Sequence, residues 1–383
     1  MQRQIKVLCI IGTRPEAIKM APVILAIRQQ TWAQVTVVAT AQHRQLLDQV
    51  LSFFDIKPEI DLDVMQPNQA LSILTAQMLL KLDNVLLVEK PDIVLGQGDT
   101  TTVMVAALAC FYNKIPFGHV EAGLRTGQLD YPFPEEANRV IAGHLARLHF
   151  APTESARQNL LREGVNDHDI YVTGNTVIDA LLKASERAES YAPKVAPGRR
   201  LILMTAHRRE NFGSPLERIC EAVRTIADQR DDIEFLYPLH PNPHVKEVVE
   251  RILRAHPRIR LTASLDYLPF IAAMQKAYLI LTDSGGVQEE APALGKPVLV
   301  LREETERPEA VREGVVKLVG TDTAYIVSET LRLLDDSVAY RAMARGISPY
   351  GDGKAADRIV AILRNLLLGS TPLKWIPSAG PPL

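Results

Sequence analysis

The sequence predicts an α/β protein made of two Rossmann-like domains, each a doubly wound parallel sheet, that face each other across a cleft. Short β-branched runs alternate with longer helical stretches along the whole chain. The chain has 383 residues, too many for one ordinary core, and the pattern starts again near its middle. Because ligands bind at the carboxyl ends of strands in such folds, the residues after each strand decide the function.

The strands expected in the first half are residues 5–11, 35–39, 92–96, 115–120, 148–152 and 170–173. The stretch 184–200 mixes charge with Pro and Gly and lacks apolar periodicity, so it predicts a linker or hinge. The strands expected after it are 201–206, 233–239, 259–263, 278–282, 297–301 and 315–320. We therefore expect domains at 1–175 and 176–350, and a loosely ordered, Pro-rich tail at 369–383.

Composition excludes several classes of partner. The chain carries 43 basic and 45 acidic residues, a balance that predicts neither a nucleic-acid nor an anionic-membrane partner. Its three cysteines, Cys9, Cys110 and Cys220, stand singly in apolar stretches, which indicates buried thiols and no zinc site. We find no window with the roughly 18 apolar residues of a spanning helix, and no cleavage site, so we expect a cytoplasmic protein.

The loop after the first strand offers an anion site. Gly12 allows a tight turn, Pro15 suits a first helical turn, and Arg14 and Lys19 add two positive charges near a helix start. A solvated basic helix start is an equally good interpretation. The loop lacks the GxGxxG pattern, which disfavours a dinucleotide cofactor.

Two later loops of the first half carry carboxylates. Asp99 follows the third long strand, and the simplest interpretation makes it the N-cap of the next helix. The broken loop 119–139 presents His119, Glu121, Arg125, Glu135, Glu136 and Arg139. Such loops are usual places for binding chemistry, although many are only solvated surface. Glu121 directly follows a strand residue, so we expect it to point into the cleft.

Two strand-end segments of the second half each present a histidine. His207, with Arg208 and Arg209 after it, follows the first strand of this half. A polar helix start is the simpler alternative. His240 stands between prolines, which pin the backbone and present the ring.

The most specific local signal is the segment 282–290, a strand followed by a Gly-rich helix start. Ser284 is the expected N-cap, and Gly285 and Gly286 leave the backbone N–H groups open, as in a phosphate cradle. Glu290 lies one turn further on and could accept from ribose hydroxyls, although Glu289 and Glu290 could simply complement the helix dipole. Arg307 offers a further diphosphate ligand, and Phe270 could stack on a base or simply belong to the core.

Taken in order from Gly12 to 347–355, these segments resemble the non-hydrolysing bacterial UDP-N-acetylglucosamine 2-epimerase family. The resemblance implies the two-domain GT-B architecture, with a last helix near 352–367 crossing back to the first domain, and a homodimer. It implies a catalytic group of Asp99, Glu121, Glu135 and His207. It implies that the substrate is held by Arg14, Lys19, His240, Phe270, Ser284, Gly285, Gly286, Glu290 and Arg307.

The resemblance also implies a second pocket, where the substrate acts as activator, lined by Gln42, Gln45, Glu135 and Arg208. Asn68 stands where some members have a basic residue there. Two further departures are Gln97, where the family often has His, and Leu265, where some members have Gln. We expect neither of these two to touch the acid–base group.

The function implied is reversible inversion of carbon 2 of UDP-N-acetylglucosamine, by elimination of UDP to a bound glycal and its re-addition, without metal or other cofactor. Three alternatives stay open: a GT-B glycosyltransferase, which would need an acceptor pocket, a hydrolysing epimerase that releases free N-acetylmannosamine and UDP, and a catalytically silent UDP-sugar sensor.

Overall fold

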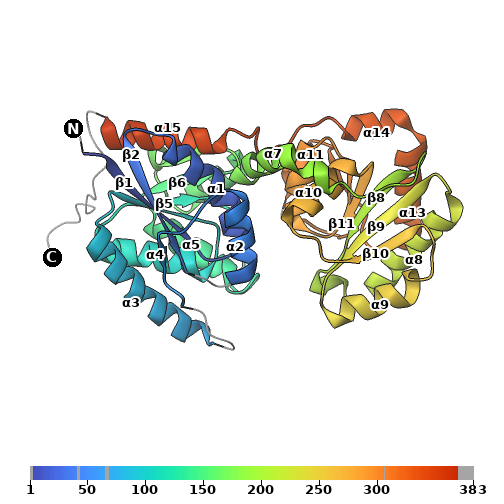
Figure 1. Cartoon of the computed structure of the whole chain (residues 1–383), viewed down its shortest axis with the longest axis horizontal. Coiled ribbons are helices and arrows are strands. Elements are labelled where there is room, and N and C mark those ends of the chain that lie inside the picture. Colours follow the sequence, from blue (N-terminus) through green and yellow to red (C-terminus); the bar gives the residue numbers. More distant parts are fainter. Residues whose placement is uncertain (1–2, 41–43, 65–68, 306, 370–383) are drawn as a thin grey trace. The chain divides into compact units, whose positions relative to one another are not determined.

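The computed structural model describes residues 3–40, 44–64, 69–305 and 307–369, and of residues 44–46 it describes only the backbone. The chain forms two compact units (Figure 1). Unit 1 comprises Met1–Ala180 with Gly353–Leu383, and unit 2 comprises Leu181–Asp352. Each unit holds one parallel sheet with helices around it, which confirms the predicted α/β class with two doubly wound sheets.

Unit 1 is built on seven parallel strands in the order β3-β2-β1-β4-β5-β6-β7. The strands are β1 (Ile5–Ile11), β2 (Ala33–Ala39), β3 (Ile60–Asp61), β4 (Ile93–Gln97), β5 (Phe117–Val120), β6 (Leu148–Ala151) and β7 (Ile170–Val172). The two-residue strand β3 was not predicted, because so short a strand has no apolar run to reveal it. The strand order reverses direction between β1 and β4, which makes this the switch point of the sheet.

Eight α-helices belong wholly or partly to the described part of unit 1. They are α1 (Arg14–Arg28), α2 (Arg44–Phe53), α3 (Leu71–Glu89), α4 (Thr101–Tyr112), α5 (Glu135–Leu145), α6 (Glu154–Arg162), α7 (Thr176–Ala188) and α15 (Ala355–Leu368). A 3-10 turn, η1 (Asp167–Asp169), precedes β7.

Helix α7 corrects the predicted linker, because residues 184–188 are helical and continue into a 3-10 turn, η2 (Glu189–Tyr191). Its buried side includes Ala180, Leu181, Ala184 and Ala188, whose helical spacing is regular. Three of these four residues are alanine, and so small a side chain gives a weak apolar signal.

The prediction that no segment has the length and apolar composition of a membrane-spanning helix is wrong, because helix α3 has both. It has 19 residues and is apolar enough, by length and composition, to do so. Its residues Leu74, Met78, Leu82 and Leu86 recur every four positions and pack into the core of unit 1 with β1 and β4. A single buried stripe of this kind is typical of a surface helix that packs one face on a globular core.

Helix α15 returns the end of the described chain to unit 1, where it packs on α1. The Asp179 carboxylate of α7 accepts from the backbone N–H groups of Ala355 and Ala356, at 3.2 and 2.8 Å. A carboxylate at a helix N-terminus satisfies free N–H groups and complements the helix dipole. Arg358 adds a hydrogen bond to the Thr173 carbonyl at 3.0 Å.

Unit 2 repeats the plan with six parallel strands in the order β10-β9-β8-β11-β12-β13. The strands are β8 (Arg200–Thr205), β9 (Ile233–Leu239), β10 (Ile259–Ala263), β11 (Leu279–Thr282), β12 (Val298–Val300) and β13 (Val316–Leu318). Its helices and 3-10 turn are η3 (Arg209–Asn211), α8 (Ser214–Gln229), α9 (Pro243–Leu253), α10 (Tyr267–Lys276), α11 (Gly285–Ala293), α12 (Pro308–Arg312), α13 (Thr323–Asp335) and α14 (Ser337–Met343).

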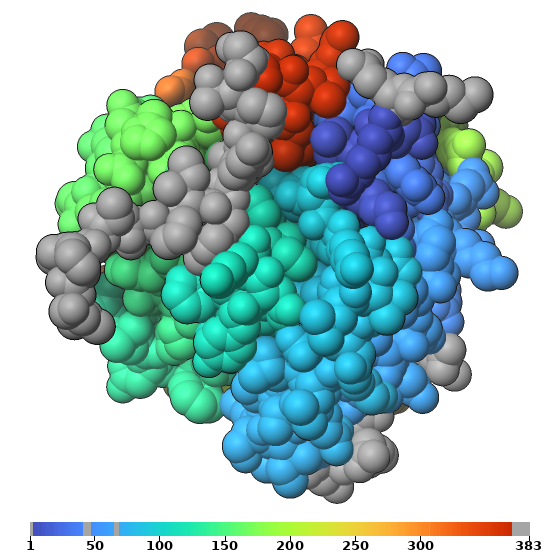
Figure 2. All heavy atoms as spheres, turned by 90° about the vertical axis from the view of Figure 1, so that its left-hand side faces the viewer, coloured from blue at the N-terminus to red at the C-terminus, as the bar shows by residue number. Residues whose placement is uncertain are grey.

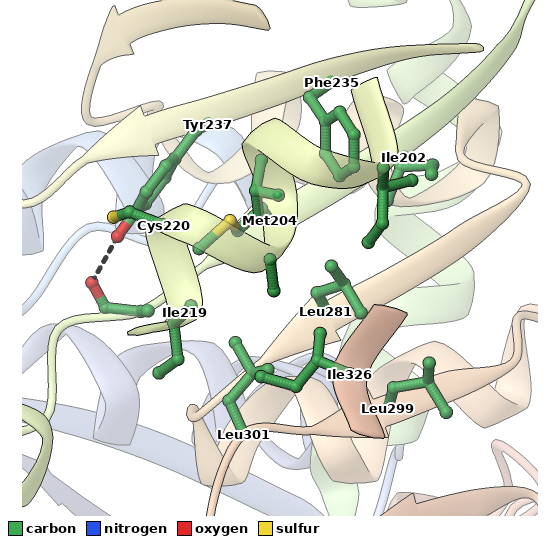
Figure 3. Close-up of a cluster of buried hydrophobic side chains, with 14 of the residues drawn as sticks. Ile202, Met204, Ile219, Cys220, Phe235, Tyr237, Leu281, Leu299, Leu301 and Ile326 are labelled. Carbon is green, nitrogen blue, oxygen red and sulfur yellow. Dashed lines mark hydrogen bonds between the residues drawn. The ribbon is translucent and has the colours of Figure 1, made fainter. Parts of the chain in front are cut away.

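A large core cluster of unit 2 lies between the sheet and helices α8, α9 and α13 (Figure 3). Tyr237 is fully buried there, and its hydroxyl donates to the Ala206 carbonyl at 2.7 Å, so the buried polar atom is satisfied. The three cysteines are buried and free, as predicted, and burial raises the pKa of each thiol, that of Cys220 to about 12.

Candidate functional site

Most of the predicted site residues follow the carboxyl ends of strands at or near the switch point of each sheet. In unit 1, β4 pairs with β1 on one side and β5 on the other, so the loops after these three strands leave the same edge. In unit 2, β8 and β11 are neighbours, and Thr205 pairs with Thr282 at their ends. These edges are where doubly wound sheets bind ligands.

The loop after β1 is locked by a buried carboxylate. Glu16 Oε2 accepts from the backbone N–H groups of Gly12 and Thr13, at 2.9 and 2.5 Å, and Thr13 caps helix α1. The other oxygen of Glu16 accepts from the Thr100 hydroxyl at 2.6 Å, which ties this loop to the start of α4. Arg14 therefore begins a helix whose position is fixed relative to the β4 loop.

Glu121 is the most constrained of the predicted catalytic residues. It is buried and has a left-handed backbone, with φ of 64°, which few residues other than glycine adopt without a reason. Its carboxylate accepts from Lys19 Nζ at 2.6 and 2.7 Å, from Asn175 Nδ2 at 3.0 Å, and from Gln97 Nε2. The expectation that Gln97 stays clear of the acid–base group is therefore wrong, because the ends of β4 and β5 are adjacent.

Asp99 makes an ion pair and does not serve as the helix cap. Arg139 Nη2 contacts Asp99 Oδ2 at 2.5 Å, and Asn138 donates to the Asp99 carbonyl at 2.9 Å. The N-cap of α4 is Thr100, whose hydroxyl accepts from Val103 N. The interpretation of Asp99 as a cap is wrong because the threonine next to it takes that role.

Arg139 also binds Glu136, at 3.0 Å, and so joins the β4 loop to the first turn of α5. The other oxygen of Glu136 accepts from the backbone N–H groups of Thr126 and Gly127. Glu136 therefore holds the irregular loop in shape. Its neighbour Glu135 begins α5 and is half-buried.

His119 is buried on β5, and its Nε2 lies 2.7 Å from the Gly98 carbonyl oxygen. Burial lowers the pKa of His119 to about 4, with a smaller effect of the same sign from Arg125. Its neighbour in register on β6 is His149, whose pKa burial lowers to about 3. Both rings are therefore neutral parts of the core below the site.

Two histidines stack at the edge of the second sheet. The rings of His207 and His240 lie 5.1 Å apart and 10° from parallel. Asp283, which follows β11, is fully buried and holds the loop that carries His207. Its Oδ2 accepts from the backbone N–H groups of His207 and Arg208, each at 2.8 Å, and from Asn211 Nδ2 at 3.0 Å.

Helix α11 begins with the predicted glycines, and an arginine lies against its first turn. Ser284 occupies the N-cap position, but its side chain makes no capping hydrogen bond. A Cβ on Gly285 would lie 2.6 Å from Arg307 Cζ, so only glycine permits this close approach. Arg307 Nε donates to Glu289 Oε1 at 2.6 Å, which orients the guanidinium. Backbone N–H groups and a guanidinium converge here, as at an anion site.

The remaining predicted residues lie on helices α10 and α11 or outside the described structure. Phe270 is half-buried on α10, and Glu290 is partly buried on α11. Gln42 and Asn68 are outside the described residues, as is the side chain of Gln45.

Of five residues that shape the two sites, sequence reasoning overlooked Asn175 in unit 1 and Asp283 in unit 2, and it named Gln97, Arg139 and Glu289 without giving them these roles. Four of them stand in or next to segments already singled out, so position at a strand end was an available signal. Among the described residues, no group of three His, Cys, Asp or Glu side chains could hold a metal ion.

Comparison with known proteins identifies relatives over nearly the whole chain. A family model described as UDP-N-acetylglucosamine 2-epimerase matches residues 25–364. The UDP-N-acetylglucosamine 2-epimerase of Escherichia coli (strain K12) is 54% identical over 371 residues, which cover 94% of this chain and 98% of that protein.

Solved structures agree. The UDP-GlcNAc 2-epimerase from Neisseria meningitidis, bound to UDP-GlcNAc, is similar with a TM-score of 0.86 and 47% identity, covering 94% of this chain and 99% of that one. The enzyme from Methanocaldococcus jannaschii, in complex with UDP-GlcNAc and UDP, has a TM-score of 0.76 and 35% identity, covering 94% and 99%.

Proposed function

The chain belongs to the UDP-N-acetylglucosamine 2-epimerase family, and we propose that it interconverts UDP-N-acetylglucosamine and UDP-N-acetylmannosamine by inverting carbon 2. The observation that carries the proposal is the buried Glu121, placed at the end of β5 beside the switch point of unit 1 and held by three donors. Family membership favours this reaction over glycosyl transfer, the first alternative.

The mechanism follows from the weak acidity of the hydrogen on carbon 2. A carboxylate cannot remove it directly, so UDP leaves first and takes the electron pair of the bond between carbon 1 and oxygen. The positive charge that develops on carbon 1 acidifies the neighbouring C–H. A base then takes that proton, and a glycal with a double bond between carbons 1 and 2 forms. Re-addition of UDP, with a proton delivered to the opposite face of carbon 2, completes the inversion.

Unit 2 would stabilise the departing UDP. The N–H groups at the start of α11 and the guanidinium of Arg307 supply positive charge where negative charge develops on the diphosphate. His207 would protonate or stabilise a phosphate oxygen, while Ser284, Glu290 and Phe270 would hold the ribose and base.

Unit 1 would supply the acid–base groups. Lys19, Gln97 and Asn175 orient the carboxylate of Glu121, and Arg139 orients that of Asp99. Glu135, on the first turn of α5, completes the group. Proton transfer by positioned side chains of this kind accelerates reactions by about 10² to 10⁴-fold.

The test is incubation with UDP-N-acetylglucosamine in deuterated water, with no acceptor present. We expect UDP-N-acetylmannosamine and deuterium at carbon 2 to appear together, with little free UDP. Substrate recovered without deuterium and without epimer would refute the proposal, and stoichiometric free UDP would indicate the hydrolysing reaction. Glu121→Gln should abolish exchange, whereas Glu247→Gln, at an exposed position on α9, should not.

We also propose that two copies of the chain associate through helix α3. Ile73, Leu80 and Leu87 recur every seven residues on the side of α3 opposite its buried stripe, and Leu80 is 70% exposed. Figure 2 shows this face of unit 1, with the light-blue residues of α3 at its lower part. Exposed apolar stripes of this length mark interfaces. Light scattering should give a dimer for the parent chain and a monomer for Leu80→Asp.

The activator pocket is a further proposal, made for a second molecule of UDP-N-acetylglucosamine. Arg208 supports it, because the Asp283 carboxylate fixes its backbone beside His207. Initial rates should rise sigmoidally with substrate concentration, and Arg208→Ala should make this dependence hyperbolic.

We propose a cytoplasmic location, supported by three buried free thiols that suit a reducing compartment.

A further inference from the structure

We propose that Asp283 is the positioning residue for His207, holding a proton on Nδ1 of the ring so that Nε2 is the atom that exchanges a proton with the substrate. The inference rests on the proposed function, because it gives His207 its role in that reaction. The argument uses contacts within unit 2 alone.

The two residues meet because β8 and β11 are adjacent strands. Thr205 and Thr282 pair at the strand ends, and their hydroxyls lie 2.6 Å apart. The chain continues to His207 on one side and to Asp283 on the other. Residues 76 positions apart in the sequence are thereby neighbours at the switch point.

The two oxygens of Asp283 have different surroundings. Oδ2 is saturated by two backbone N–H groups and by Asn211 Nδ2. Oδ1 is buried, and within the described part of the chain no group donates a hydrogen bond to it. An unsatisfied carboxylate oxygen in a core is costly and calls for a function.

The His207 ring supplies the missing donor. Its Nδ1 lies 3.7 Å from Asp283 Oδ1, longer than a hydrogen bond but short enough to become one after a small rotation of the ring. Catalytic hydrogen bonds are often long without substrate and tighten when it binds. The parallel ring of His240, 5.1 Å away, restricts the other motions of His207.

The charge state of the ring makes the tautomer matter. Burial lowers the pKa of His207, the neighbours His240 and Arg208 act in the same direction, and Asp283 opposes them. The ring is therefore neutral near pH 7 and carries one proton on either Nδ1 or Nε2. A donor to Asp283 must carry it on Nδ1, so Nε2 is the atom that takes up a second proton from solvent, and the carboxylate stabilises the resulting imidazolium. The Nε2–H of that imidazolium can give its proton to the departing phosphate oxygen and recover it when UDP re-adds.

The decisive variant is Asp283→Asn. The side-chain oxygen of asparagine can still accept the two backbone N–H groups, which keeps the loop in place. Its NH₂ group then points at His207 Nδ1 and favours the opposite tautomer. We expect kcat to fall by about 100-fold or more with a small change in KM, and the limb of the pH–rate profile that reports His207 to disappear.

Two comparisons separate positioning from structural support. In a His207→Gln background, Asp283→Asn should lower kcat by less than about threefold, because the two residues act as one unit. Asn211→Ala removes the donor to Asp283 Oδ2 and to the Leu301 carbonyl but leaves Oδ1 untouched, so it should lower the melting temperature without removing the pH limb. Equal losses in both backgrounds, or a raised dissociation constant for UDP with unchanged kcat, would overturn the inference.

The tautomer can be observed directly, even if the asparagine variant does not fold. Two-bond ¹H–¹⁵N spectra of the parent protein, with the His207 signal assigned from His207→Gln, should show the proton on Nδ1; a proton on Nε2 would overturn the inference. A parent protein that binds UDP but exchanges no deuterium at carbon 2 would refute the proposed function, whichever tautomer is seen.

Discussion

Replacing His119 with glutamine should make unit 1 less sensitive to acid. The histidine is fully buried on β5, and its Nε2 contacts the Gly98 carbonyl oxygen at 2.7 Å. A glutamine amide can donate to the same carbonyl but has no proton to gain. The variant therefore removes one titration while keeping the hydrogen bond.

The size of the effect follows from the pKa. Burial lowers the pKa of His119 from 6.5 to about 4. Between these two pH values the ring is protonated in the unfolded chain but neutral in the folded protein. The unfolded state binds more protons below about pH 6.5, so stability falls as the pH falls and levels off only below about pH 4. From about pH 7.5 to about pH 5, the loss due to this residue is about 2 kcal/mol.

The assay is urea denaturation of both proteins across this pH range. Trp32 lies beside β2 in unit 1, so its fluorescence reports the unfolding of that unit. The second tryptophan, Trp375, is replaced by Phe in both proteins to leave one signal. His149 also titrates with a lowered pKa, but it is present in both proteins and largely cancels in the difference.

The parent should lose about 2 kcal/mol more than His119→Gln on going from about pH 7.5 to about pH 5. A constant packing cost at all pH values would not affect this difference. Parallel curves of unfolding free energy against pH would refute the reasoning, because they would mean that His119 titrates normally in the folded protein.

Three further predictions follow from single contacts. Lys19→Met leaves the buried carboxylate of Glu121 without its cation and should lower the unfolding free energy by about 3 kcal/mol in urea, with loss of exchange at carbon 2. Gly285→Ala pushes the guanidinium off the first turn of α11, so calorimetry should show at least about tenfold weaker UDP binding. Gly123→Ala places a Cβ 2.3 Å from a backbone oxygen of α6 at a residue whose φ is 87°, so it should lower the unfolding free energy by more than about 2 kcal/mol. Gly127→Ala, where φ is 79° and the Cβ meets open space, should lower it less.

Local patterns were sufficient to predict the fold class and most elements. Residues 7–11 of β1, 93–96 of β4 and 235–239 of β9 are buried apolar runs, and the Gly285-Gly286 pair after β11 identified the start of helix α11. The failures have local causes as well. Alanine-rich spacing hid the helix in residues 184–188, and the threonine beside Asp99 took the role of the cap.

The sequence by itself determined which residue types stand at the strand ends, because apolar periodicity and turn residues act over a few positions. Only the tertiary structure decided which of these residues meet. Gln97 contacts Glu121 because β4 and β5 are neighbours, and Asp283 reaches His207 because β11 inserts beside β8. The order of strands in a parallel sheet depends on crossovers that bury whole helices, and no local spacing encodes it.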